Sequence, residues 1–236
     1  MIGRKSAVAG LIGLAVGGGA VALASGQLGA DPEQRRVEKI VHDYVLAHPE
    51  IIPQAMERLQ AREMAKAVDA NRAAFETPFG SAWAGAERGD VVLVEFFDYA
   101  CGFCRKSNPD IERLLGEDKN LKVVWRELPV LGPDSIAAAQ ASLAAARQGK
   151  FRPFYDKLFE AGRPTAAALA ETQQAVGVAA APASADLQAE IQKNYQLAQS
   201  INATGTPTFV VGDQVLQGAV GYQALKDAIG AARAKS

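Results

Sequence analysis

The chain has 236 residues, of which 49% are hydrophobic and 22% are charged, with two cysteines and a formal net charge of −1. This length and composition are those of one ordinary globular domain plus additional segments, and such a chain buries a core without a disulfide framework. The near-zero charge gives no general electrostatic attraction to nucleic acid, so we expect no nucleic-acid partner.

The amino-terminal segment has the plan of a secretory signal peptide. A basic pair, Arg4 and Lys5, is followed by the apolar run of residues 7–24, and residues 22–24 fit a small-residue cleavage site. An uncleaved membrane anchor is the alternative, since this run approaches the length that spans a bilayer. We expect residues 1–24 to be a signal peptide and the protein to be periplasmic, where disulfides form and persist.

Residues 25–76 are predicted to form a helical arm. Asp31 and Pro32 fit a helix start. Apolar residues then recur at helical spacing: Val37, Ile40, Val41, Tyr44 and Val45. Pro49 and Pro53 interrupt the pattern before a second helix. The arm is too small to bury its own core, so its apolar stripe packs on the main domain or on another copy of the chain. We favour a homo-oligomer formed through residues 32–75.

Residues 77–236 are expected to form the main domain. Residues 77–90 are rich in small residues and indicate a linker or an irregular entry. Strands are predicted at 91–97 and around 122–127, helices over about 133–200, and a strand pair around the turn in "TPTFVVGDQVLQG", before a final amphipathic helix. This order predicts an α/β fold, a small sheet interrupted by a helical insertion.

Both cysteines lie in "EFFDYACGFCRKSNPD", directly after the first predicted strand. The apolar pattern that follows indicates a helix beginning near Cys101, where unpaired N–H groups and the helix dipole stabilise a thiolate. We expect Cys101 to be the exposed attacking thiol. Cys104, one turn further, is the deeper thiol that resolves a mixed disulfide. Gly102 lets a substrate chain approach closely, and Phe103 adds no charge of its own.

A metal site and a structural disulfide are the alternatives for the cysteine pair. Zinc normally takes four ligands, and only His42 and His48 could join the two thiols. These histidines lie in the arm at a spacing that does not share one helical face. A disulfide across three positions closes a small loop and stabilises little. We therefore favour a redox pair that requires no metal and no organic cofactor.

Two more positions have both a functional and an ordinary interpretation. Glu95 lies inside an apolar strand, where it either faces solvent or is a buried carboxyl near Cys104 that moves protons with a raised pKa. Pro207 opens a strand in "TGTPTFVVG". Taken by itself, an ordinary trans proline is the simpler interpretation of that position.

Together, "VVLVEFFDYACGFC", the helical insertion and "GTPTFVVG" resemble exported thioredoxin-fold thiol–disulfide oxidoreductases of the DsbA type, over about residues 90–234. The resemblance implies a cis peptide at Thr206–Pro207 that faces Cys101 and holds the substrate backbone, with Gly102 and Phe103 beside it. It also implies that Glu95 is the buried acid near the resolving cysteine. Expected partners are cysteine-containing exported proteins and a membrane redox partner.

A narrower resemblance is to the branch of suppressor-of-copper-sensitivity (ScsC-like) proteins. It rests on "HPEIIPQAMERLQ", "FFDYACGFC", "ELPVLGPDS" and "AAARQGKF". Members of this branch can carry a helical arm that makes trimers and supports isomerase activity, whereas others are monomeric oxidants or reductants. The resemblance therefore implies a trimer or dimer through the arm and leaves the direction of electron flow open.

Two departures from the better-known oxidants bear on that direction. Gly-Phe stands between the cysteines instead of Pro-His, and Thr206 stands before the proline instead of valine. The missing histidine removes one source of thiolate stabilisation, which predicts a less oxidising pair. We expect an enzyme that isomerises or reduces disulfides. The alternatives are a dithiol oxidase and a copper-binding chaperone that holds Cu(I) on its two thiolates.

Overall fold

The computed structural model describes residues 31–179 and 184–235, so the predicted signal peptide lies outside the described residues. The chain divides into two compact units, Met1–Ala55 and Met56–Ser236. Within the described ranges, none of the helices has both the length and the hydropathy of a membrane-spanning segment.

The first unit contains α2 (Pro32–Ala47) and the start of α3 (Ile51–Ala70). The Asp31 carboxylate caps α2 by accepting a hydrogen bond from the backbone N–H of Glu33 at 3.1 Å, as the sequence predicts. Only the first of the two prolines interrupts the helical pattern, because α3 includes Pro53 in its first turn. A proline is tolerated there since the first N–H groups of a helix have no partner within it.

The second unit carries the sheet and the helical insertion. After α3 its elements are α4 (Arg72–Glu76), β1 (Trp83–Gly85), β2 (Val91–Phe97), α5 (Gly102–Glu117), β3 (Leu121–Glu127), α6 (Pro133–Arg147), α7 (Phe151–Ala161), α8 (Ala166–Val176), α9 (Ala185–Ser200), β4 (Thr208–Val211), β5 (Gln214–Gln217) and α10 (Tyr222–Arg233). The predicted order is confirmed with one addition: β1 forms within residues 77–90, which were expected to be a linker. Its three residues pair antiparallel with β3. A strand this short does not show from its sequence alone which strand it will pair with.

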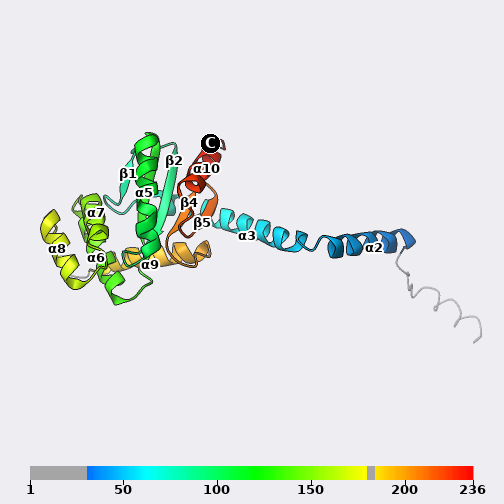
Figure 1. Cartoon of the computed structure of the whole chain (residues 1–236), viewed down its shortest axis with the longest axis horizontal. Helices are drawn as coiled ribbons and strands as arrows, with labels where there is room; N and C mark the ends of the chain where they lie inside the picture. Colours follow the sequence, from blue (N-terminus) through cyan, green and yellow to red (C-terminus); the bar gives the residue numbers. More distant parts are fainter. Residues whose placement is uncertain (1–30, 180–183, 236) are drawn as a thin grey trace, which may run out of the picture. The chain divides into compact units, whose positions relative to one another are not determined.

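The five strands lie in the order β1-β3-β2-β4-β5. Strands β2 and β3 are parallel, and the other neighbouring pairs are antiparallel. Helices α5 and α10 pack together on one face of the sheet, and α6, α7 and α8 are grouped beside it at the left of the view (Figure 1). The α/β thioredoxin-like architecture with a helical insertion is therefore confirmed.

Alternate residues of β2 belong to different apolar cores. Leu93 and Phe97 pack with Cys104 in the core beneath α5, α7 and α10. Val94 and Phe96 belong to a second core, which α4 and α9 complete. Because side chains alternate along a strand, Glu95 shares the face of Leu93 and Phe97, which is the face of Cys104.

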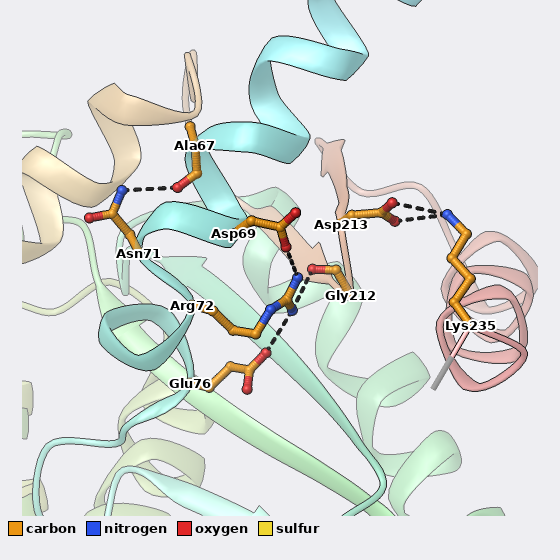
Figure 2. Close-up of polar contacts among 8 residues, drawn as sticks. All are labelled: Ala67, Asp69, Asn71, Arg72, Glu76, Gly212, Asp213 and Lys235. Carbon is orange, nitrogen blue, oxygen red and sulfur yellow. Dashed lines mark hydrogen bonds and ion pairs between the residues drawn. The ribbon is translucent and has the colours of Figure 1, made fainter.

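Polar contacts close the end of the sheet at which β2 begins (Figure 2). The Arg72 guanidinium donates a hydrogen bond to the backbone carbonyl of Gly212 at 3.0 Å and pairs with the Asp69 carboxylate. Lys235 pairs with Asp213 at 2.9 Å. These contacts join the α3–α4 junction to the β4–β5 turn and to the residues after α10, at the end of β2 opposite to the cysteines.

Candidate active site

The two cysteines lie at the amino terminus of α5. Cys101 is the N-cap residue, and Cys104 lies in the first turn of the helix. Both thiols are free. Cys104 is completely buried. Only 6% of the surface of Cys101 is exposed, so the prediction that Cys101 is exposed is wrong. The packed thioredoxin-like core covers most of Cys101, which is nevertheless the more accessible of the two.

Asp98 holds the turn that carries Cys101, and the sequence analysis missed it. Its backbone carbonyl accepts a hydrogen bond from the N–H of Cys101 at 3.0 Å. One carboxylate oxygen accepts from the N–H of Ala100, and the other from the N–H groups of Val130 and Leu131, at 2.8 to 3.0 Å. The signal in the sequence was an aspartate just after a buried strand, a position that favours a side-chain-to-backbone turn.

The environment moves the pKa values of the two thiols in opposite directions. The pKa of Cys101 is lowered to about 5, mainly by its hydrogen bond with the Cys104 thiol, and further by Thr206 and the N–H groups of Cys104 and Phe103. Burial raises the pKa of Cys104 far above its usual value. No histidine lies between the cysteines, and the donors that lower the pKa of Cys101 come from the fold around it.

The loop before β4 faces Cys101. The Thr206–Pro207 peptide bond is cis, as the family resemblance implies. The Cys101 thiol lies 3.2 Å from the backbone carbonyl oxygen of Thr206. The Pro207 carbonyl accepts a hydrogen bond from Gly218 N–H at 2.8 Å, which anchors the loop to the residue after β5. The structure thus brings together residues that lie about a hundred positions apart in the sequence.

Glu95 is completely buried, which excludes the solvent-facing alternative. It pairs in register with Trp125 of β3 and Phe209 of β4, the two neighbours of β2. Burial raises its pKa to about 8, and polar contacts with Trp125 and Tyr155 act in the opposite direction. Its charge in turn raises the pKa of Cys104. A carboxyl with this pKa next to a buried thiol is suited to accept and return a proton near neutral pH.

The surface around Cys101 is apolar and open. Phe103 is 65% exposed, and apart from the adjoining residues and the backbone of α5 no atom lies within 4 Å of the position that a Cβ of Gly102 would occupy. Val130 and Leu131, held by Asp98, are also exposed. A groove of about 410 Å³ adjoins the loop before the cis proline. Its lining includes Leu128, Val130, Tyr195, Ala203, Thr204 and Gly205.

A second buried acid lies on β3, and the sequence analysis did not identify it. Glu127 accepts a hydrogen bond from the Ser142 hydroxyl at 2.7 Å, and that hydroxyl also lies 2.8 Å from the Tyr99 hydroxyl. Burial raises the pKa of Glu127 to about 7. The segment "ELP" at the end of a predicted strand offered no signal that distinguished this carboxyl from a surface one.

The described residues contain no group of three or more His, Cys, Asp or Glu side chains placed to hold a metal ion. The two histidines lie on α2 and next to it, outside the unit that holds the cysteines. The arrangement at Cys101 and Cys104 is suited to sulfur exchange, because a low-pKa thiol and a buried, high-pKa thiol share one helical turn.

Two family models match the chain. The DSBA-like thioredoxin domain matches residues 92–230, which is more than half of the chain. The copper resistance protein ScsC N-terminal domain matches residues 33–66, within the helical arm. The two matches therefore fall on the two parts that the sequence analysis separated.

Solved structures agree with these family models. A linker-deletion mutant of ScsC from Proteus mirabilis is 25% identical, with a TM-score of 0.73, and the similarity covers 89% of this chain and 100% of that one. A thioredoxin-like oxidoreductase from Silicibacter pomeroyi is 35% identical, with a TM-score of 0.64, over 69% of this chain and 96% of that one.

Among curated proteins, disulfide bond formation protein D of Bacillus subtilis is 26% identical over 163 residues, which are 61% of this chain and 73% of that protein. A shorter similarity links the chain to a Na⁺/H⁺ antiporter of Salinispora arenicola, at 36% identity over 76 residues. The chain spans only 12% of the length of that antiporter.

Proposed function

Because the chain belongs to the family of DSBA-like thioredoxin domains, we propose that it is an exported thiol–disulfide oxidoreductase that isomerises or reduces disulfides in other exported proteins. The observation that carries this proposal is the placement of Cys101, a low-pKa thiol at a helix amino terminus, 3.2 Å from the carbonyl oxygen of Thr206. This geometry presents one reactive sulfur beside a backbone segment on which a substrate chain can lie.

The reaction begins with the Cys101 thiolate. It attacks one sulfur of a substrate disulfide, forms a mixed disulfide and releases the other substrate sulfur as a thiolate. In reduction, Cys104 gives its proton to Glu95 and attacks the Cys101 sulfur. The Cys101–Cys104 disulfide forms, and the second substrate sulfur leaves with the electron pair. In isomerisation, a thiol of the substrate resolves the mixed disulfide, and the Cys101 thiolate is regenerated.

Residues beside Cys101 are proposed to bind the substrate. Thr206 and Pro207 hold its backbone, and Gly102 allows that backbone to come close. Phe103 and the neighbouring groove offer apolar contact on either side of the attacked sulfur. Such contacts suit unfolded or misfolded chains, which expose apolar side chains near their cysteines.

Two features support isomerisation or reduction over oxidation. Thr206 before the cis proline resembles the isomerase and reductase members of the family. The arm matches the ScsC N-terminal domain, and a homo-oligomer through residues 32–75 would place several Cys101 sites around one substrate. The low pKa of Cys101 acts in the other direction, because a stabilised thiolate makes the disulfide form a stronger oxidant. A dithiol oxidase is therefore the alternative to be separated by experiment.

The periplasm is the proposed compartment. The signal-like amino terminus supports export, and a structure from Salmonella enterica that is 27% identical is described as a periplasmic thioredoxin-like protein. Reduction of a substrate leaves the Cys101–Cys104 disulfide, and a membrane redox partner is proposed to restore the dithiol. Its substrates would be exported proteins that contain cysteines.

The decisive experiment is the refolding of an enzyme with scrambled disulfides by the purified protein in a glutathione buffer. A parallel sample starts from the reduced, unfolded enzyme. Recovery of activity from the scrambled form is expected. Activity on the reduced form alone would assign the oxidase function instead, and no activity on either form would remove the proposal.

Copper binding is a second candidate, because the family model that matches the arm is named for copper resistance. Two adjacent thiols suit Cu(I), a soft ion. Titration with Cu(I) in the presence of glutathione tests this function. Retention of one Cu(I) per chain, together with the absence of disulfide exchange, would favour a copper chaperone over the proposed enzyme.

A further inference from the structure

The buried acid Glu95 is in contact with the helical insertion and also interacts electrostatically with both cysteines. Its Oε2 atom lies 3.4 Å from the hydroxyl of Tyr155 on α7, and that hydroxyl donates a hydrogen bond to Asn108 Oδ1 at 2.8 Å. Tyr155 is buried and Asn108 is half-buried. These contacts lead from the carboxyl beside Cys104 to the surface between α5 and α7.

A cation from the same helix approaches this group. Arg152 lies three residues before Tyr155, so the two side chains share one face of α7. The Arg152 guanidinium carbon lies 4.9 Å from the centre of the Trp125 ring and 5.7 Å from that of Tyr155. Its Nη2 atom pairs with Glu112 at 2.6 Å and with Asp156 at 2.9 Å. The outer half of the guanidinium is thus anchored at the surface, and the inner half is turned towards the core.

Three buried polar atoms of this cluster make no hydrogen bond of normal geometry among the described residues, although Trp125 interacts with Glu95 closely enough to lower its pKa. They are Glu95 Oε1, Trp125 Nε1 and Arg152 Nη1. Only four such side-chain atoms occur in the described part of the chain, and three of them belong to this one cluster. Buried polar groups are normally paired with protein or with ordered water. This cluster therefore combines one acceptor, on Glu95, with two donors, on Trp125 and Arg152. The donors are of the kind that stabilise the Glu95 carboxylate when it ionises.

We propose that Arg152 and Tyr155 are positioning residues for Glu95, which hold its carboxylate in place when Cys104 is to give up its proton, so that the helical insertion is part of the redox site. This inference rests on the proposed exchange reaction, in which Glu95 takes that proton. Coulomb attraction from Arg152 favours the ionised form of Glu95 against the effect of burial, and so lowers its pKa.

The other groups that face Glu95 act on it as well. They are Cys101 and Cys104 from α5, Tyr99 from the turn after β2, and Trp125 from β3. The thiolate of Cys101 raises the pKa of Glu95, whereas Coulomb attraction from the Arg152 guanidinium lowers it.

The test is a pH titration of Glu95 itself, followed by NMR of the reduced protein with carboxyl-¹³C glutamate and assigned with Glu95→Gln. Arg152→Gln is expected to move the midpoint of Glu95 upwards by about one pH unit, a tenfold gain in proton affinity. Arg152→Lys should restore most of the difference. Tyr155→Phe, which removes the hydroxyl that lies 3.4 Å from Glu95 Oε2, should also move the midpoint upwards.

The matched control is Lys157→Gln, which removes a cation from the same helix. Lys157 pairs with Glu160 at the surface, and its substitution should leave the midpoint unchanged. Arg152→Met, which keeps apolar bulk against Trp125, serves if the glutamine variant does not fold. An unchanged midpoint in a folded neutral variant, or an equal shift with Lys157→Gln, would overturn the inference.

A kinetic arm separates this inference from the proposed function. The rate at which Cys104 resolves a mixed disulfide should rise with pH through the Glu95 midpoint, and Arg152→Gln should move that rise to higher pH. The attack by Cys101 should keep its pH dependence. A wild-type protein that forms no mixed disulfide would refute the proposed function, whereas normal exchange with an unmoved resolution profile would refute the role of Arg152 alone.

Discussion

Cys101 and Cys104 have the same side chain but pKa values that are moved in opposite directions, although only two residues separate the N-cap position of Cys101 from the more deeply buried Cys104. The Cys104 thiol is the largest contributor to the low pKa of Cys101, about 5, while burial of Cys104 keeps its own proton in place. These properties support the proposal, made already from the sequence, that Cys101 is the attacking thiol and Cys104 the resolving one, and a trapping experiment tests it.

Cys101→Ala is expected to abolish disulfide exchange, because no thiolate is then available at the helix terminus. Cys104→Ala should instead accumulate mixed disulfides, since the resolving thiol is missing. Both are measured by non-reducing electrophoresis after incubation with a substrate protein. Retained exchange in Cys101→Ala, or the absence of any trapped species in Cys104→Ala, would contradict the assignment.

Cys104→Ala also provides a test of the electrostatics. Removal of the Cys104 hydrogen bond should raise the pKa of Cys101 above about 5. Thiolate absorbance in the ultraviolet, titrated with Cys101→Ala as the blank, measures the midpoint. A midpoint that does not move would show that the backbone N–H groups and Thr206 are enough to lower the pKa of Cys101 without the Cys104 thiol.

Asp98 is expected to be important for the stability of the site. Asp98→Ala leaves the N–H groups of Ala100, Val130 and Leu131 without their acceptor, which should lower the free energy of unfolding by about 1–3 kcal/mol. Urea denaturation measures this change. The exposed Asp227→Ala serves as a control and should change stability by less than about 0.5 kcal/mol. An equal loss of stability in the two variants would show that the Asp98 hydrogen bonds do not stabilise the protein more than an ordinary surface contact does.

At the scale of elements, helix α2 has an apolar face that is not buried within its own unit. It contains no buried residue, and Val37, Ile40, Val41 and Tyr44 are about half exposed. A helix with such a stripe gains stability only when another surface covers it. The proposal of self-association through residues 32–75 follows from this face.

Light scattering of the purified protein is expected to show more than one chain per particle. The double variant Ile40→Glu and Tyr44→Glu should give single chains, because it places charges on the apolar face. Arg35→Glu, on the opposite face of α2, should leave the assembly intact. A wild-type monomer would remove the proposed oligomer and shift the balance towards a monomeric oxidase or reductase.

At the scale of the whole molecule, the buried acids make stability depend on pH. Burial raises the pKa values of Glu95 to about 8 and of Glu127 to about 7, whereas in the unfolded chain both lie near 4.5. Between those values the folded state binds more protons than the unfolded state, so these two groups make the free energy of unfolding fall as pH rises. Cys101 has the opposite sign, because its lowered pKa makes that free energy rise between about pH 5 and 9.

The free energy of unfolding of Cys101→Ala is therefore expected to fall steadily from about pH 5 to 8, by an amount on the order of a few kcal/mol. The reduced wild-type protein should show a flatter profile, since the Cys101 contribution offsets the fall. Denaturant titrations over this pH range measure both. A second substitution, Glu95→Gln, should make the free energy of unfolding of Cys101→Ala depend less on pH. If that free energy is already independent of pH in Cys101→Ala alone, burial does not raise the pKa of Glu95.

The local sequence pattern predicted most of the helices and strands, but not which strands lie next to one another in the sheet. The strands β2 and β3 and the helices of the insertion follow from runs of apolar residues with clear spacing. Strand β1 was missed because three residues carry too little periodicity, and its pairing with β3 depends on a distant segment. The exposure of Cys101 was misjudged for the same reason, since the residues that cover a side chain come from elsewhere in the chain.

The amino-acid sequence by itself determined the α/β order, the cysteine pair at the start of a helix, and the family resemblance, because these depend on spacing along the chain. Only the tertiary structure decided that Glu95 is buried, that Thr206 meets Cys101, that Asp98 holds the turn and that Arg152 reaches the core. Burial, pKa and hydrogen bonding are properties of neighbours in space, and residues far apart in the sequence become neighbours only when the sheet and its insertion close around them.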